Sequence, residues 1–80
     1  MARVEVRLYA SLRRYLPRVE LGEAVELELD EGATVRHVYE KLGLPESEVK
    51  RIIVNGLSRG HEHILLDGDR VAIFPPVAGG

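Results

Sequence analysis

Two stretches near the N-terminus alternate apolar and polar residues. The first covers residues 1–9, and the second follows Gly22 and covers residues 24–29. A period of two residues is typical of a strand that buries one face, because successive side chains point to opposite sides. We therefore expect two half-buried strands, joined by a connector longer than a tight turn. Their apolar positions are Val4, Val6 and Leu8 in the first and Val25, Leu27 and Leu29 in the second.

A helical pattern begins after Thr34. Apolar residues recur there at spacings i, i+3, i+4 and i+7, which places them on one face of a helix. Thr34 stands at the N-cap position, and Gly43 stands where a left-handed residue would end the helix. Pro45 then prevents the helix from continuing. The apolar face consists of Val35, Val38, Tyr39 and Leu42.

The turn signals Asn55-Gly56 and Asp67-Gly68-Asp69 divide the C-terminal half into short elements. We expect strands over residues 51–54 and 70–74, a loop with a short strand over residues 57–66, and helical turns within residues 10–17 and 45–50. The first of these turns is expected to bury Leu12 and Leu16. The order β-β-α-β-(β)-β favours a two-layer α+β fold, with one amphipathic helix across one face of a mixed sheet. If the first and last strands pair at its centre, they run parallel.

The composition excludes several classes of protein. Eighty residues, 45% apolar and 30% charged, fit one small globular domain. The absence of cysteine excludes disulfides, thiolate nucleophiles and cysteine-ligated metals. A net charge of −2 and dispersed basic residues argue against a nucleic-acid partner. The chain has no apolar run of membrane-spanning length and no signal-peptide pattern, so we expect a cytoplasmic protein without a membrane partner.

The segment after the last expected strand differs from an ordinary polar terminus. Residues 75–80 read Pro-Pro-Val-Ala-Gly-Gly and carry no charged side chain. The prolines favour an extended path, and glycine lets the backbone approach another surface closely. At about 3.3 Å per residue, this segment would carry its last carboxylate about 20 Å from the fold. We therefore expect the tail to enter a narrow channel in another protein, with the carboxylate of Gly80 as the reacting group.

Phe74 stands at the root of this tail. If Val71 and Ile73 point into the core, Phe74 points outward by the two-residue period. A parallel first strand then presents Arg7 and Glu5 on the same outer face. An exposed aromatic ring beside an apolar tail favours a partner-docking patch. The alternative is that Phe74 packs over a sheet edge.

Two polar groupings have simpler interpretations. His61-Glu62-His63 would place two imidazoles on one face of a strand, but no third ligand is evident unless His37 approaches from the helix. We interpret them as solvated surface histidines and expect no metal site. Asp67 and Asp69 flank a glycine and are interpreted as turn residues, with hydrogen bonding to a partner backbone near the tail as the alternative.

The segment from Leu66 to Gly80 (LDGDRVAIFPPVAGG) closely resembles the C-terminal signature of the MoaD family, the small subunits of molybdopterin synthase. The strings Tyr9-Ala10-Ser11-Leu12-Arg13 and Val54-Asn55-Gly56 also resemble that family, which belongs to the MoaD/ThiS ubiquitin-like superfamily. The resemblance implies a β-grasp domain over residues 1–74, with a mixed four- to five-stranded sheet packed on one main helix. It also implies a free C-terminal Gly-Gly tail over residues 75–80.

The resemblance further implies a sulfur carrier for molybdenum or tungsten cofactor synthesis, which is not an enzyme alone and binds no cofactor. A MoeB-like adenylyltransferase would use ATP to activate Gly80 as an acyl-adenylate. Sulfur from a donor such as a cysteine desulfurase would then give a thiocarboxylate. A MoaE-like large subunit would receive the tail, with Phe74 and Arg7 docking on the partner. Gly79 would let the channel close around the tip, and the path of the tail would be set by Pro75, Pro76, Val77 and Ala78.

Other functions remain open from the sequence. The same activated glycine would serve a ubiquitin-like modifier that is conjugated through Gly80 to lysines of target proteins. A sulfur carrier for thiamine synthesis or tRNA thiolation would need the same C-terminal chemistry. A β-grasp interaction domain with an inert tail is the third class.

Overall fold

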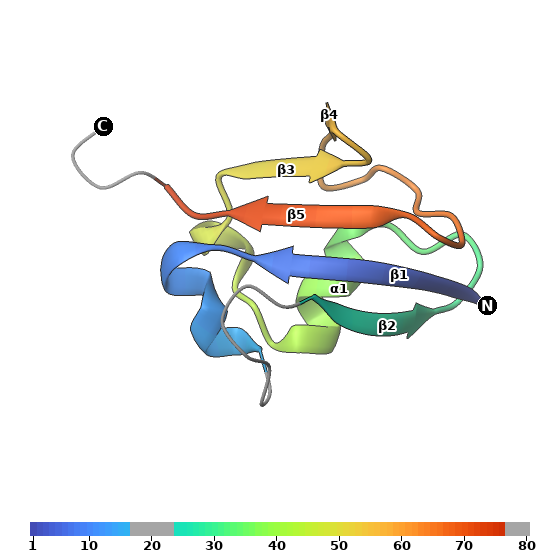
Figure 1. The fold of residues 1–80 in the computed structure, drawn as a ribbon, viewed down its shortest axis with the longest axis horizontal. Coiled ribbons are helices and arrows are strands. Elements are labelled where there is room, and N and C mark those ends of the chain that lie inside the picture. The colour runs from blue at the N-terminus through green and yellow to red at the C-terminus, as the bar shows by residue number, and fades with distance from the viewer. Residues whose placement is uncertain (17–23, 77–80) are drawn as a thin grey trace.

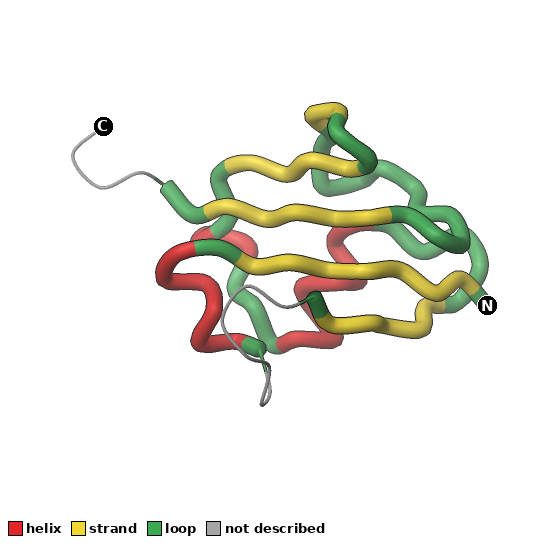
Figure 2. The backbone as a smooth tube through the Cα atoms, viewed as in Figure 1, coloured by secondary structure: helices red, strands yellow, loops and turns green. Residues whose placement is uncertain are grey.

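A computed structural model describes residues 1–16 and 24–76 and shows a five-stranded sheet with the order β2-β1-β5-β3-β4 (Figure 1). The strands are β1 Ala2–Leu8, β2 Val25–Leu29, β3 Arg51–Val54, β4 Leu57–Ser58 and β5 Arg70–Phe74. β1 and β5 run parallel at the centre, and the other neighbouring strands pair antiparallel. The main helix α1 (Val35–Leu42) lies behind the sheet in the view of Figure 2. The predicted α+β class, a mixed β-grasp sheet on one main helix, is confirmed.

The core lies between the sheet and α1. Val4, Val6 and Leu8 of β1 are at most 4% exposed, and Ile73 of β5 is fully buried. The apolar positions that alternation assigned to the inner face of the central strands therefore form the core. Burying a side chain of this kind stabilises the fold by about 1.5–3 kcal/mol. From the helix, Val35 and Val38 complete the layer and are also fully buried.

Helix α1 is closed at both ends as its sequence predicts. The Thr34 amide donates to Nδ1 of His37 at 2.9 Å, so His37 acts within a capping box rather than as a free imidazole. Gly43 has a φ of 68°, the left-handed conformation that ends a helix with little strain in glycine. The first amides of α1, those of Val35 and Arg36, donate to backbone carbonyls of residues 63 and 61 at 3.0 and 2.9 Å.

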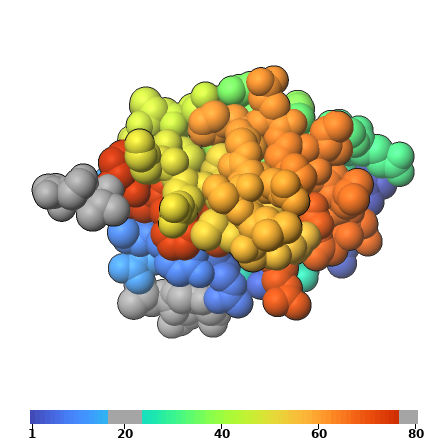
Figure 3. Space-filling view, turned by 90° about the horizontal axis from the view of Figure 1, so that it is seen from above, coloured from blue at the N-terminus to red at the C-terminus, as the bar shows by residue number. Residues whose placement is uncertain are grey.

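The interpretation of His61 as a solvated surface histidine is wrong. Its side chain is 35% exposed, and its Nδ1 lies 2.8 Å from the hydroxyl oxygen of Tyr39. Burial raises the pKa of the Tyr39 hydroxyl, so this group stays protonated and hydrogen-bonded at neutral pH. The segment between β4 and β5 is thereby attached to α1 through both backbone and side chain. Figure 3 shows this segment, in orange, covering the side of the molecule that it views.

Two short 3₁₀ helices close one end of the molecule. They are η1 Ala10–Tyr15 and η2 Glu46–Glu48. Leu12 is fully buried as expected, whereas Leu16 is only half-buried. The Tyr15 hydroxyl donates to Glu48 at 2.8 Å, which ties η1 to η2. No helix among residues 1–16 and 24–76 is long and apolar enough to cross a bilayer.

Both predicted turns are present, and the second one also contributes a buried, hydrogen-bonded carboxylate, that of Asp69. Asn55 and Gly56 have φ values of 52° and 85°, as a two-residue hairpin between β3 and β4 requires. The carboxylate of Asp69 is 9% exposed and accepts hydrogen bonds at 2.8 Å from Nδ2 of Asn55 and from the Leu66 amide. The alternative that Asp69 serves a partner near the tail is therefore wrong, because its oxygens are engaged within the fold and it precedes β5.

Candidate functional site at the root of the tail

Three elements converge where β5 ends. Because β1 and β5 are parallel, Leu8 and Ile73 pair at the same end of the sheet. η1 begins there, directly after β1, and β3 begins there with Arg51 paired to Phe74. The Lys50 amide donates to the Phe74 carbonyl at 2.8 Å. The root of the tail is thus held on both sides by backbone, which fixes the direction in which the chain leaves the sheet (Figure 1).

An aromatic pair marks this root. The rings of Tyr9 and Phe74 stack with centroids 4.5 Å apart and planes 6° from parallel. Tyr9 is 38% exposed and Phe74 is half-buried. Phe74 lies on the outer face of the sheet, as the two-residue period predicts, and its partner ring rather than a sheet edge covers it. A stacked aromatic pair of this kind contributes about 0.5–1.5 kcal/mol beyond the area it buries.

Sequence reasoning missed Tyr9 as a candidate docking residue. The register between β1 and β5 could have identified it. Arg7 pairs with Ala72, so a residue two positions beyond each faces the same side. The Tyr9 amide donates to the Ile73 carbonyl at 3.2 Å, which continues the ladder past the end of β1. Tyr9 and Phe74 therefore belong to one surface, defined here as the aromatic stack.

The backbone bends sharply next to the aromatic stack. Ala10 has a φ of 52°, in the left-handed region where a side chain with a Cβ is disfavoured by about 1–2 kcal/mol. This conformation turns the chain from β1 into η1 and leaves Tyr9 beside Phe74. Strained residues of this kind persist only where the surrounding structure holds them. Here the buried Leu12 and the Leu12 amide, which donates to the Tyr9 carbonyl at 3.1 Å, hold the bend.

Arg7 lies on the same outer face as the aromatic stack. Its Nη2 is 3.3 Å from Oε1 of Glu5, so the two predicted outer-face charges form an exposed ion pair. Exposed pairs of this kind contribute little to stability. The geometry brings Arg7 and Phe74 onto one surface, and the docking role of each stays a prediction.

The remaining predicted site residues are only partly within the described structure. Pro75 is half-buried and Pro76 is exposed, directly after the end of β5. Val77, Ala78, Gly79 and Gly80 lie outside the described residues. The division into a domain over residues 1–74 and a tail over residues 75–80 therefore stays a prediction, as does the chemistry at Gly80.

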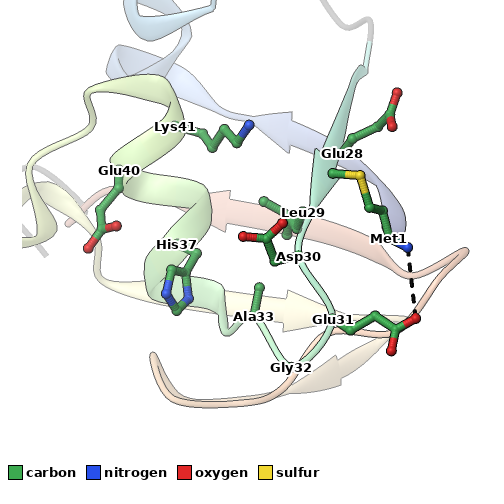
Figure 4. A pocket seen from close by; sticks show the side chains of 10 residues that line it. All are labelled: Met1, Glu28, Leu29, Asp30, Glu31, Gly32, Ala33, His37, Glu40 and Lys41. Atoms are coloured by element: carbon green, nitrogen blue, oxygen red, sulfur yellow. Dashed lines mark ion pairs between the residues drawn. The ribbon is translucent and has the colours of Figure 1, made fainter.

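A hollow lies at the opposite end, between β2 and α1 (Figure 4). This groove has a volume of about 470 Å³, and four of its ten lining residues are acidic. Asp30 and Lys41 extend into the space between the two elements (Figure 4). Glu31 pairs with the N-terminal amine at 3.8 Å, and Glu28 pairs with Arg3 at 3.5 Å. Within residues 1–16 and 24–76, no three His, Cys, Asp or Glu side chains are arranged to hold a metal ion.

The parallel β1–β5 pair at the centre of a five-stranded sheet, with one helix across it, defines a ubiquitin-like protein. The chain matches the Mut7-C ubiquitin family over residues 1–79 and belongs to that family. It lies within the MoaD/ThiS ubiquitin-like superfamily.

Solved structures agree with this assignment. The chain is 30% identical to the putative molybdopterin converting factor subunit 1 from Pyrococcus furiosus, over 96% of this chain and 100% of that one, with a TM-score of 0.71. A Haloferax volcanii protein solved in solution is 29% identical, over 99% and 87%, with a TM-score of 0.74. The small archaeal modifier protein 1 from Methanosarcina acetivorans is 27% identical, over 100% and 98%, with a TM-score of 0.69. No curated protein matched the chain significantly.

Proposed function

We propose that this protein is a sulfur carrier for molybdopterin synthesis, whose C-terminal Gly80 is adenylated and then converted to a thiocarboxylate. The observation that carries the proposal is the sequence Pro-Pro-Val-Ala-Gly-Gly, which follows directly on the aromatic stack at the end of β5. Similarity over nearly the whole length to a putative molybdopterin converting factor subunit supports the choice of pathway.

The proposed chemistry divides between this chain and its partners. A carboxylate is a poor electrophile, so a MoeB-like adenylyltransferase would transfer AMP from ATP to the Gly80 carboxylate and release pyrophosphate. A persulfide on a donor such as a cysteine desulfurase would then displace AMP from the acyl carbon, and a thiol reductant would cleave the S–S bond of the resulting acyl disulfide, which leaves the thiocarboxylate on Gly80. The chain has no cysteine, so a C-terminal acyl group is where it would carry sulfur. We place these reactions in the cytoplasm, with ATP bound by the partner.

The fold holds the root of the tail in one direction. Lys50 and Arg51 hold Phe74 at the sheet end, so the direction of the tail is fixed where it begins. Pro75 and Pro76 extend the path, and Gly79 lets a narrow channel close around the tip. The aromatic stack, with Arg7 nearby, would dock on the adenylyltransferase first and on a MoaE-like large subunit afterwards.

A second candidate function is conjugation to other proteins. The similarity to a small archaeal modifier protein at 27% identity favours it. The two functions share the acyl-adenylate and differ only in the nucleophile, which for conjugation is a lysine amine of the target. Sulfur transfer to thiamine precursors or to tRNA would also use the same Gly80 thiocarboxylate. The product formed from Gly80 therefore separates a modifier from a sulfur carrier.

The test is the intact mass of untagged protein purified from its own cells with little reductant. We expect a mass gain equal to exchange of oxygen for sulfur, located by fragmentation at Gly80. A variant lacking Gly80 is the matched control, because it should keep the fold and lose the modification. Unmodified protein, together with diglycine remnants on lysines of other proteins, would replace the carrier function with conjugation.

A further inference from the structure

We propose that the partner surface that receives the root of the tail is acidic and is recognised by three cations placed around the aromatic stack. The inference rests on the proposed function and adds the chemistry of the adenylyltransferase surface. The cations are Arg13, Lys50 and Arg51, here named the cationic rim. All three are exposed.

Two members of the cationic rim are tied to the root by backbone. The Lys50 amide donates to the Phe74 carbonyl at 2.8 Å, and Arg51 is the register partner of Phe74 in β3. Figure 3 shows the yellow segment that precedes β3 next to the red end of β5. The backbone of both residues is therefore held beside Phe74, at the root of the tail.

Arg13 completes the rim from the other side. It lies in η1, which begins one residue after Tyr9. Its Nε donates to the Ala10 carbonyl at 3.3 Å, so the guanidinium is held along η1 while its terminal nitrogens keep their donors. A planar guanidinium with such donors is well suited to a carboxylate on another surface.

Four arginines elsewhere in the described structure already form ion pairs: Arg3, Arg7, Arg14 and Arg36 each pair with a glutamate. In the described ranges 1–16 and 24–76, no ion pair involves Arg13, Lys50 or Arg51, and the same holds for Lys41, Arg59 and Arg70. The cationic rim is therefore distinguished by its position at the root of the tail, where Lys50 and Arg51 contact Phe74 through the backbone.

The rim also opposes the overall charge of the protein. The chain carries a net charge of −2, and the groove at the opposite end carries Glu28, Asp30, Glu31 and Glu40. An acidic partner surface is thus attracted more strongly by the tail end than by the groove end. Charge complementarity of this kind orients the encounter and raises its rate. Nucleic acid is a poorer fit, because three cations around an apolar stack make no stripe along a phosphate backbone.

The experiment measures kcat/KM for ATP-dependent adenylation of this protein by the adenylyltransferase of its own cells, at several salt concentrations. We expect Lys50→Glu and Arg51→Glu each to lower kcat/KM about tenfold, with kcat at saturation unchanged, because rim charges act on encounter. The matched control is Lys41→Glu, the same charge reversal on α1 at the groove end, with an expected change under about twofold. Lys50→Arg should keep the wild-type rate.

The possible results distinguish failure of this inference from failure of the proposed function. Equal loss in Lys50→Glu and Lys41→Glu, or a wild-type rate that does not fall with added salt, would overturn the acidic partner surface while the proposed function stands. A wild-type protein that is never adenylated would overturn the proposed function and the role of the rim together. Thermal unfolding of each variant separates these results from loss of the fold.

Discussion

The two ends of this small domain use the same kinds of residue differently. At the tail end, the aromatic stack is partly exposed and the cationic rim has no internal partner among the described residues. At the groove end, Glu28 and Glu31 pair with cations of the same chain, and Asp69 in the turn before β5 is buried and accepts two hydrogen bonds. These three carboxylates therefore serve the fold, whereas the three cations of the rim form no ion pair within residues 1–16 and 24–76.

The groove and the predicted chemistry lie at opposite ends of the molecule. The groove has a volume of about 470 Å³, whereas the proposed reacting group belongs to the tail. The tail end is distinguished by the left-handed backbone of Ala10 and by the partly exposed ring of Tyr9. Under the proposed function these features suit docking on a partner, because the Gly80 carboxylate would enter the partner's channel.

The largest effect on stability is expected from Asp69. Asp69→Ala leaves Nδ2 of Asn55 and the Leu66 amide without their acceptor, so we expect the free energy of unfolding to fall by about 2–3 kcal/mol. Chemical denaturation measures this change. Asp67→Ala is the control, because that exposed carboxylate accepts only the Arg3 amide and should cost no more than about 1 kcal/mol. Equal losses would contradict the distinction between the buried carboxylate of Asp69 and the exposed carboxylate of Asp67.

The next effect is expected at the tail end and concerns binding rather than stability. Phe74→Ala removes one ring of the aromatic stack, and a central aromatic contact of an interface contributes about 2 kcal/mol. We therefore expect affinity for the adenylyltransferase to fall about 30-fold, as measured by titration calorimetry. Tyr9→Phe keeps the stacked ring and should retain most of the affinity. If Phe74→Ala binds like the wild type, the aromatic stack is only structural.

The smallest effect concerns Glu46, the first residue of η2, which pairs with Arg36 of α1. Hydrogen bonding from Arg36 lowers the pKa of Glu46, so any stabilisation from this pair is complete above the ordinary carboxyl pKa. It is lost as the pH falls through the lower value of the folded state. Arg36→Gln should return the Glu46 pKa toward its ordinary range, which carbon-detected NMR titration of the carboxyl group measures. An unchanged midpoint would show that the ion pair does not persist in solution.

The sequence predicts the strands, the helix and the core better than it predicts the side-chain contacts on the surface. Alternation identifies the inward residues of β1 and β5, and the Thr34–Gly43 frame identifies α1, because these are local patterns with a single period. The hydrogen bonds of His61 and Asp69 escape prediction, since their partners lie 22 and 14 residues away. Ala10 escapes as well, because no propensity favours a left-handed alanine. The outward position of Phe74 is predictable from period alone, whereas its stacking on Tyr9 requires knowledge of the parallel register.

The central claim is that partner proteins bind at the tail end. NMR mapping of the isotope-labelled protein during titration with its adenylyltransferase tests this claim most directly. We expect amide signals of Tyr9, Arg13, Arg51 and Phe74 to shift or broaden first, while those of Glu31 and Lys41 beside the groove stay unchanged. Changes confined to amide signals of residues beside the groove, with no change in those of the tail end, would contradict this claim.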